Sequence, residues 1–399
     1  MSYKVRQLIL DSGERLPVLC SATGMPIGNP LLYVLTELRA RGRSSATIRH
    51  AMEAVMVLCM TLDRQRISLD DRLRRGTFLQ LHELDLIVRD ASQKIRAIAS
   101  DAIAPIGRAS AASRLHYILQ YLRWHASRHL LLIDIRTDEY LALRDRIERA
   151  CSSLKARSPC AGVRSEIDQR QGLSEEHLNK VLLTAGGAND QSIWTNEHAR
   201  TRNRLLLRWF LDLGVRRGEI LGVRTSDIDF QQNIVRIARR ADSKHDPRAQ
   251  QPLVKTKARD LSLSDDLAES TYDYVMGLRA KQGAARRHDY LFVASGSGRP
   301  LSLAGLSKIF TVMRAADPNF PQELTPHVLR HTWNDRFSLT MEKSGINPEM
   351  EKKMRSMLMG WSPTSDTAAV YTRRHVRKMA SQAMKDMQKQ LRIQGGKNE

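Results

Sequence analysis

Side chains that can bind or attack a phosphate lie close together between residues 325 and 374. The run Thr-Pro-His-Val-Leu-Arg-His-Thr-Trp contains His327 and Arg330, and Trp361 and Tyr371 follow it. Imidazole, guanidinium and indole groups can all donate hydrogen bonds to anionic oxygens. A tyrosine hydroxyl can act as a nucleophile that forms a covalent intermediate. The spacing therefore predicts a phosphate-directed site in which Tyr371 is the nucleophile.

Two cationic side chains further upstream could serve the same site. Arg216 lies in the run Gly-Val-Arg-Arg-Gly-Glu-Ile-Leu, and a planar guanidinium can hold two phosphate oxygens at once. Glu219 follows three residues later, so an ordinary ion pair within one helix is the alternative interpretation. Lys255 could protonate a leaving oxygen as a general acid, or it could form with Lys257 a basic turn that merely touches a polyanion.

The charge balance favours a polyanionic partner. The chain has 64 Lys and Arg against 43 Asp and Glu, a formal net charge of +21. Nucleic acid is the obvious partner, although basic proteins also bind membranes and acidic proteins nonspecifically. The sequence contains no run of about 18 apolar residues, so we expect no transmembrane helix. The first residues also lack a signal-peptide pattern.

The cysteines predict a reducing, cytoplasmic setting. Cys20, Cys59, Cys151 and Cys160 are scattered, and no two of them form a Cys-x-x-Cys pair.

At 399 residues the chain exceeds the usual size of one domain, so we expect two. Apolar residues at helical spacing predict an all-helical first domain, and the second should be mostly α with a small antiparallel β-sheet. The segment after residue 150 consists mainly of small, polar and basic residues, a composition typical of a linker. The expected boundaries are 1–27 for an N-terminal arm with a strand or two, 28–150 for the helical domain, 151–171 for a basic linker, and 172–399 for the last domain with its C-terminal helix.

Local signals place the elements within these domains. Helices of the first domain are expected from Asn29-Pro30, from Ser44 or Ser45, over 78–90, from Ser110, and over 134–149. Ser174 is expected to cap the first helix of the second domain. Strands are expected at 234–237, 251–255 and 259–263, with a hairpin tip at 256–258 and helices resuming at Asp265.

The chemical pieces, taken in order, resemble the tyrosine recombinases, also called phage-type integrases. The family's elements correspond to Gly-x-Arg-x-x-Glu at 214–219, Lys-Thr at 255–256, His-x-x-Arg-His at 327–331, and Gly-Trp with the later Tyr at 360–371. Four such pieces in the family's order, across about 155 residues, are far more specific than any one of them. The resemblance is sharpest over residues 172–380. The helical segment before it looks like the family's core-binding domain.

The resemblance implies a role for each matching residue. Tyr371 would attack the scissile phosphate and leave a 3′-phosphotyrosyl link, which conserves bond energy so that religation needs no ATP. Fixed cations would take the place of a metal, so no cofactor is expected. Arg216 and Arg330 would bind the non-bridging phosphate oxygens, and Lys255 would act as the general acid. His327 would assist proton transfer at the tyrosine hydroxyl, and Trp361 would donate a hydrogen bond. Glu219 and His331 would be supporting residues.

Two departures from the family's pattern concern the last element. Tyr371 follows Trp361 by ten residues, one more than we expect of the family, and the extra residue is expected within 362–366. Trp361 also occupies a position that is His in most members. An indole cannot carry a proton, so activation of Tyr371 would depend more on His327 and the two arginines.

The resemblance also implies partners. We expect double-stranded DNA held in a clamp of two domains, four copies of the chain on two DNA sites, and an accessory directionality factor. An apolar stripe formed by Val376, Met379, Ala383, Met387 and Leu391 either packs on its own domain or docks on a neighbouring copy. On DNA, the protein would be associated with the nucleoid.

Two other functions remain open at this point. A type IB topoisomerase shares this chemistry but relaxes DNA as a monomer, and a catalytically idle DNA-binding protein could keep the fold. Phage, transposon, cassette and chromosome-resolution systems all fit the resemblance.

Overall fold

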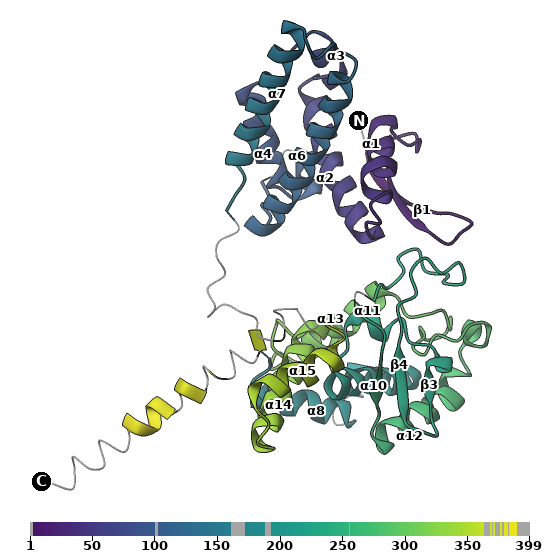
Figure 1. Ribbon diagram of the computed structural model, residues 1–399. Helices are drawn as coiled ribbons and strands as arrows, with labels where there is room; N and C mark the ends of the chain where they lie inside the picture. Colours follow the sequence, from purple (N-terminus) through teal and green to yellow (C-terminus); the bar gives the residue numbers. More distant parts are fainter. Residues whose placement is uncertain are drawn as a thin grey trace, which may run out of the picture. The chain divides into compact units, whose positions relative to one another are not determined.

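The computed structural model divides the chain into two compact units, Met1–Gln169 and Arg170–Glu399 (Figure 1). It describes residues 3–99, 103–160, 172–187, 193–254, 256–362, 368, 370–371, 376, 379–381 and 383–388. Within these residues no helix is both long enough and apolar enough to cross a bilayer.

The first unit begins with an antiparallel hairpin. Strands β1 (Lys4–Ile9) and β2 (Arg15–Cys20) pair with Lys4 opposite Cys20. Every residue of β2 is buried, and Val18 and Leu19 belong to the hydrophobic core that the helices of this unit share. The expected strands are therefore present, but they are part of the first unit's core and do not form a separate arm.

The other elements in the described part of the first unit are helices, as the apolar spacing predicts. Ser44 caps α2 by accepting a hydrogen bond from the Thr47 backbone N–H at 3.3 Å. The middle of α2 is buried, with Met52 and Val55 fully enclosed. The elements are α1 (Gly28–Tyr33), the π-helix η1 (Val34–Arg39), α2 (Ser45–Arg64), α3 (Leu69–Arg74), α4 (Leu81–Ala91), α5 (Ile95–Ala99), α6 (Arg108–Leu130) and α7 (Asp138–Ala156).

The predicted linker was wrong for its first six residues. Residues 151–156 continue α7, because Cys151 and Leu154, one helical turn apart, both pack into the core at 1% exposure. The later part of that prediction, 161–171, lies outside the described residues.

The second unit is mostly helical around a central α10. Trp209 and Phe210 on α10 are completely buried and pack with the neighbouring helices and the sheet. Ser174 caps α8 by accepting from the His177 N–H, as expected. The helices are α8 (Glu175–Ala185), α10 (Glu197–Leu213), α11 (Arg217–Ile220), η3 (Thr225–Asp227), α12 (Asp265–Tyr274), the π-helix η4 (Val275–Arg279), η5 (Gly283–Arg287), α13 (Leu303–Ala316), α14 (Pro326–Lys343) and α15 (Pro348–Met359).

The sheet of the second unit is small and antiparallel, as predicted, but one expected strand is absent from its described part. Strands β3 (Ile228–Asp229), β4 (Ile234–Ile237) and β5 (Arg259–Ser262) pair in that order, with Ile237 opposite Arg259. Residues 251–254 form no strand, so the hairpin tip expected at 256–258 was also wrong.

Two features explain why the 251–254 segment does not pair. Pro252 cannot donate to a strand ladder. Arg248 anchors the preceding loop by donating to the carbonyls of Leu221 and Leu301, both at 2.9 Å. The segment packs instead on α11, where a Cβ on Gly218 would lie 2.5 Å from the Leu253 carbonyl oxygen.

A left-handed glycine ends α10 and brings together two segments that carry predicted site residues. Gly214 has φ +59°, which non-glycine residues rarely adopt, and a Cβ there would lie 2.7 Å from the Trp333 ring. Trp333 is fixed by a 2.9 Å hydrogen bond from its indole N–H to the Asp212 carbonyl. The turn thus packs the segment that leads into α11 against α14.

Replacing this glycine should destabilise the protein. Gly214→Ala combines backbone strain with a clash against Trp333, so the free energy of unfolding should fall by about 2 kcal/mol. Gly277→Ala is the matched control, because it has φ in the ordinary range and no atom within 4 Å of the added Cβ. Thermal unfolding should place Gly214→Ala several degrees below Gly277→Ala. Equal melting temperatures would contradict the proposed role of the turn.

Candidate active site

Arg216 and Glu219 are joined at the start of α11, but not as a surface pair. The Arg216 backbone N–H donates to one Glu219 carboxylate oxygen at 2.8 Å, and Arg216 Nη1 donates to the other at 3.2 Å. Glu219 is 1% exposed, whereas the Arg216 side chain is 32% exposed. The i,i+3 ion pair is therefore present, but its carboxylate is buried and not at the surface. Glu219 acts as a buried anchor that leaves the Arg216 side chain accessible.

Glu219 also binds side chains from two distant segments. Thr256 Oγ1 donates to it at 2.7 Å, and Arg259 Nη2 donates at 2.9 Å. Arg330 Nη1 lies 3.9 Å from the same carboxylate. Burial alone would raise the pKa of Glu219, but the charges and hydrogen bonds of Arg259, with Arg330 and the Arg216 N–H, bring it down to about 2. The carboxylate is therefore fully ionised at neutral pH.

Arg330 is the most deeply buried cation of this group. Thr325 caps α14 by accepting from the Val328 N–H, which sets Arg330 in the second turn. Its Nη1 donates to the Gly214 carbonyl at 2.6 Å. Its Nη2 is buried and has no acceptor among the described residues. Such a donor is suited to an anionic oxygen arriving from outside.

The Arg330 guanidinium keeps its charge despite this burial. Burial and the positive charge of Arg216 lower the pKa of Arg330 to about 9, although the Glu219 carboxylate opposes them. The group is therefore still protonated at neutral pH. Its Cζ lies 5.4 Å from the Trp361 ring, which covers one face of it.

Tyr371 lies in a small apolar cluster beside these cations. Its ring stacks on Trp361 with centroids 5.8 Å apart and planes 9° apart, and Met359 and Ala368 complete the cluster. Its hydroxyl lies 2.8 Å from His331 Nδ1. Burial raises the pKa of Tyr371, while the charges of Arg330, Arg355 and Arg216 act in the opposite direction. The tyrosine is therefore neutral at pH 7 and needs a proton acceptor to become a nucleophile.

The structure places the His331 ring at the tyrosine hydroxyl. We expected His327 at the tyrosine hydroxyl and His331 as a supporting residue, yet His331 Nδ1 forms the hydrogen bond. The His327 and His331 rings meet edge to face with centroids 4.4 Å apart. They lie four residues apart on α14, so both point to the same side of the helix.

Lys255 lies outside the described residues, but its neighbours are tied to the site. Thr256 binds Glu219, and the Lys257 backbone N–H donates to the Gly360 carbonyl at 3.2 Å. Gly360 has φ +65°, and a Cβ there would lie 2.9 Å from the Thr256 Cβ. The turn that carries Trp361 is therefore packed directly against the segment next to Lys255.

Two buried arginines were missed at the sequence level. Arg259, expected only as a strand residue, binds Glu219 and also donates from Nε to the Leu358 carbonyl at 2.5 Å. Arg355 is completely buried, and its Cζ lies 5.6 Å from the Tyr371 ring. Arg355 shares one face of α15 with Glu351 and Met359, four residues away on either side. This spacing could have indicated an inward-facing charge.

Arg355 connects the helix of Arg330 to the helix that leads into Trp361. Its Nη1 donates to the Asn334 carbonyl at 2.9 Å, its Nη2 donates to Ser338 Oγ at 2.6 Å, and it forms an ion pair with Glu351. Asn334 in turn donates from Nδ2 to the Arg330 carbonyl at 2.8 Å. A continuous polar network therefore runs from Arg355 to the backbone of Arg330.

The site as a whole carries surplus positive charge next to the Tyr371 hydroxyl, because the guanidiniums of Arg216, Arg259 and Arg330 gather around one carboxylate. This arrangement suits a phosphodiester, whose charge it would neutralise. No cluster of three or more His, Cys, Asp or Glu side chains suited to a metal occurs in the described part of the chain. The predicted residues that the structure brings together are Arg216, Glu219, Arg330, His331, Trp361 and Tyr371, with His327 against His331.

Comparison with known proteins gives a family model and two related sequences. Residues 188–378 match the model of the phage integrase family. The chain is 24% identical over 219 residues to the tyrosine recombinase XerD of Halalkalibacterium halodurans, covering 55% of this chain and 64% of that protein. It is 25% identical over 195 residues to the tyrosine recombinase XerA of Saccharolobus solfataricus, covering 49% and 50%. The matches therefore span less than two thirds of the length of either relative.

Two solved structures share the fold. The Tn1549 transposon integrase in complex with transposon right end DNA has a TM-score of 0.51 at 15% identity, covering 89% of this chain and 99% of that chain. The XerH site-specific recombinase bound to its difH substrate has a TM-score of 0.52 at 16% identity, covering 90% and 84%. At these identities the likeness is evidence for the fold alone.

Removing the charge of Glu219 should destabilise the protein in a pH-dependent way. Because the folded-state pKa is about 2 and the ordinary value is 4.5, the carboxylate stabilises the fold fully above pH 4.5 and progressively less as the pH falls toward 2. Glu219→Gln should therefore lower the free energy of unfolding by about 3 kcal/mol at pH 7. The difference from the unsubstituted protein should shrink between pH 4.5 and pH 2.

Urea unfolding at a series of pH values measures this difference directly. Glu323→Gln is the control, since Glu323 is exposed. A constant difference across the pH range, or the same loss in both variants, would contradict the role given to Glu219.

Proposed function

We propose that this chain, whose residues 188–378 match the phage integrase family model, is a tyrosine recombinase that cleaves and rejoins DNA through a 3′-phosphotyrosyl link at Tyr371. The proposal rests on the placement of the Tyr371 hydroxyl, hydrogen-bonded to His331, in one buried cluster with Arg330 and Trp361. The solved structures with this fold include an integrase and a recombinase that are each bound to DNA, which supports DNA as the substrate.

The reaction is a pair of transesterifications. The Tyr371 oxygen attacks the scissile phosphorus, the bond from phosphorus to the 5′ oxygen breaks, and the tyrosine proton passes to a base. The 5′ oxygen takes up a proton and leaves as a hydroxyl. A 5′ hydroxyl then attacks the phosphotyrosine, which releases Tyr371 and restores the phosphodiester. The number of phosphoester bonds does not change, so ATP is not required.

Arg216 and Arg330 would hold the non-bridging oxygens of the phosphate. Arg330 Nη2 is the buried donor that has no acceptor within the described residues, and the Arg216 side chain is accessible beside it. Glu219 orients both guanidiniums in advance, as stabilisation of the charge that develops on the phosphate requires. A fixed guanidinium pair supplies the positive charge, and we propose that the reaction needs no metal ion.

Proton transfer would involve the histidines, the tryptophan and Lys255. His331 Nδ1 is within hydrogen-bond distance of the Tyr371 hydroxyl and would accept its proton, with His327 beside it. Trp361 Nε1 is buried without an acceptor in the described part of the chain, so it could donate to a phosphate oxygen. Lys255 would protonate the leaving 5′ oxygen as the general acid.

We further propose that four copies act on two DNA sites and that the C-terminal segment mediates their contact. Val376, Met379 and Met387 are 50%, 42% and 61% exposed, so these members of the apolar stripe are not covered by their own unit. A neighbouring copy would cover them. An accessory directionality factor remains part of the proposal.

A nicked suicide substrate tests the covalent step. Incubated with a chelator and DNA that carries the recombination site, the protein should form a covalent adduct that Tyr371→Phe abolishes. Tyr272→Phe is the matched control, because Tyr272 is a half-exposed tyrosine of the same unit outside the site, and it should form the adduct normally. The adduct is resolved by denaturing gel electrophoresis.

The same assay separates the alternatives. Tight DNA binding without any adduct would indicate a catalytically idle DNA-binding protein. Relaxation of any supercoiled plasmid, with no exchange between two sites, would indicate a type IB topoisomerase. An absolute requirement for Mg²⁺ would contradict the proposed mechanism.

Arg355 should affect the covalent step more than DNA binding. Arg355→Met removes the positive charge beside the Tyr371 ring and the bridge to Asn334, so single-turnover adduct formation should slow by about tenfold or more. The pH at which the rate is half-maximal should rise, because this charge lowers the pKa of Tyr371. Lys353→Met, at an exposed position of the same helix, is the control. A lower melting temperature with an unchanged pH profile would mean that Arg355 serves stability alone.

A further inference from the structure

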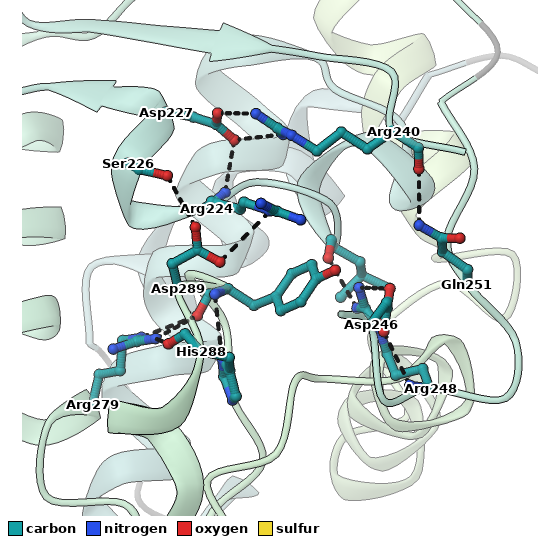
Figure 2. A network of polar contacts seen from close by, with 12 residues as sticks. Arg224, Ser226, Asp227, Arg240, Asp246, Arg248, Gln251, Arg279, His288 and Asp289 are labelled. Atoms are coloured by element: carbon teal, nitrogen blue, oxygen red, sulfur yellow. Dashed lines mark hydrogen bonds and ion pairs between the residues drawn. The ribbon is translucent and has the colours of Figure 1, made fainter. Parts of the chain in front are cut away.

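A second basic concavity lies in the same unit, apart from the candidate active site. It has a volume of about 700 Å³ and shares no lining residue with the cluster around Glu219. Residues that line it include Arg224, Arg279, Arg286, Arg287, Asp289 and Tyr290, and it is called the Tyr290 pocket below. Figure 2 shows the polar network on which it is built.

Two arginines form the ordered floor of the Tyr290 pocket. Arg279 is 6% exposed and is held by backbone carbonyls, with Nε 3.0 Å from the Tyr290 oxygen and Nη2 2.8 Å from the His288 oxygen. Carbonyl dipoles fix this guanidinium without removing its charge. Arg224 lies with its Cζ 5.4 Å from the Tyr290 ring and its Nε 3.6 Å from an Asp289 oxygen. Both side chains are therefore positioned before any ligand arrives.

The acidic residues near the pocket are mostly occupied by other partners. Arg240 binds Asp227, and Arg248 binds Asp246 through two hydrogen bonds of 2.8 and 2.9 Å (Figure 2). Asp289 is the one acid among the lining residues, and it also accepts a 3.0 Å hydrogen bond from Ser226 Oγ. Four guanidiniums therefore line a cavity that contains one carboxylate.

The rim adds charge that the protein does not neutralise. Arg286 and Arg287 are exposed, and neither forms an ion pair with a carboxylate of the described residues. Arg286 is oriented by a 3.1 Å hydrogen bond from Nε to the Ala280 carbonyl. Like charges that converge on a concave surface repel one another and concentrate the positive potential inside it. An anion in the cavity would relieve that repulsion.

We propose that the Tyr290 pocket binds a phosphate group, held by Arg224 and Arg279 with Arg286 and Arg287 closing over it. A phosphate has several oxygens that can accept from more than one guanidinium fork, whereas a carboxylate offers two. The volume exceeds that of a single phosphate, so the group would belong to a larger molecule. That molecule is either DNA, through a backbone phosphate remote from the cleaved bond, or a small phosphate ester such as a nucleotide.

Binding can be tested on the full chain with inorganic phosphate as the probe. At equal ionic strength, sodium phosphate should raise the melting temperature more than sodium chloride does. The Arg286→Gln/Arg287→Gln variant alters exposed side chains only, so it should fold normally and lose at least half of the phosphate-specific shift. Lys343→Gln/Lys353→Gln removes two exposed charges elsewhere in the unit and should keep the full shift, including any part that arises at Arg216 and Arg330.

The salt dependence of DNA binding identifies the source of the phosphate. If DNA occupies the pocket, the slope of log K against log salt concentration should fall by about two in Arg286→Gln/Arg287→Gln relative to the lysine control. An unchanged slope together with a lost phosphate shift would assign the pocket to a small phosphate ester. A smaller salt slope, or an unchanged slope with a lost phosphate shift, would each support a phosphate site. A phosphate shift and a salt slope that match those of the control would overturn the proposal, and neither result depends on the reaction at Tyr371.

Discussion

The candidate active site depends on one buried carboxylate. Glu219, almost without exposed surface, binds Arg216 and Arg259 and lies 3.9 Å from Arg330. These arginines come from the start of α11, β5 and α14, so a single side chain fixes three segments that are far apart in the sequence. Without that negative charge the guanidiniums would repel one another in a region that excludes water. The carboxylate therefore makes a concentration of positive charge compatible with a folded protein.

The balance between burial and neighbouring charge also explains the protonation states in the site. Burial raises the pKa of Tyr371 and lowers the pKa of Arg330, while the surrounding positive charges partly reverse the effect on the tyrosine. An incoming phosphate would bring negative charge to Arg330 Nη2 and Arg216, which suits a site whose donors are ordered in advance. Arg355 adds a further positive charge beside the Tyr371 ring. Its hydrogen bonds to Asn334 and Ser338 also connect α15 to α14. Tyr371 and the proposed phosphate-binding arginines are thus parts of one network.

Much of the fold could be predicted from the sequence, because apolar periodicity and serine caps are local signals. Ser44 and Ser174 cap the expected helices, and β4 and β5 lie where alternation predicted them. The errors arose where tertiary contacts decide the structure. The 251–254 segment packs on α11 and does not pair as a strand. Charged residues are expected at the surface, so Arg259 and Arg355 were not recognised as buried. His327 and His331 share a helix face, and only the position of Tyr371 shows which one it contacts.

The identity of the residue that becomes linked to DNA tests the proposed chemistry more directly than any rate. The covalent adduct would be digested with protease and nuclease, and mass spectrometry would locate the nucleotide on the peptide. We expect a peptide that contains Tyr371 joined to the 3′ phosphate, with a free 5′ hydroxyl on the other DNA end. A nucleotide on any other residue, or a link through a 5′ phosphate, would contradict the assignment of Tyr371 as the nucleophile.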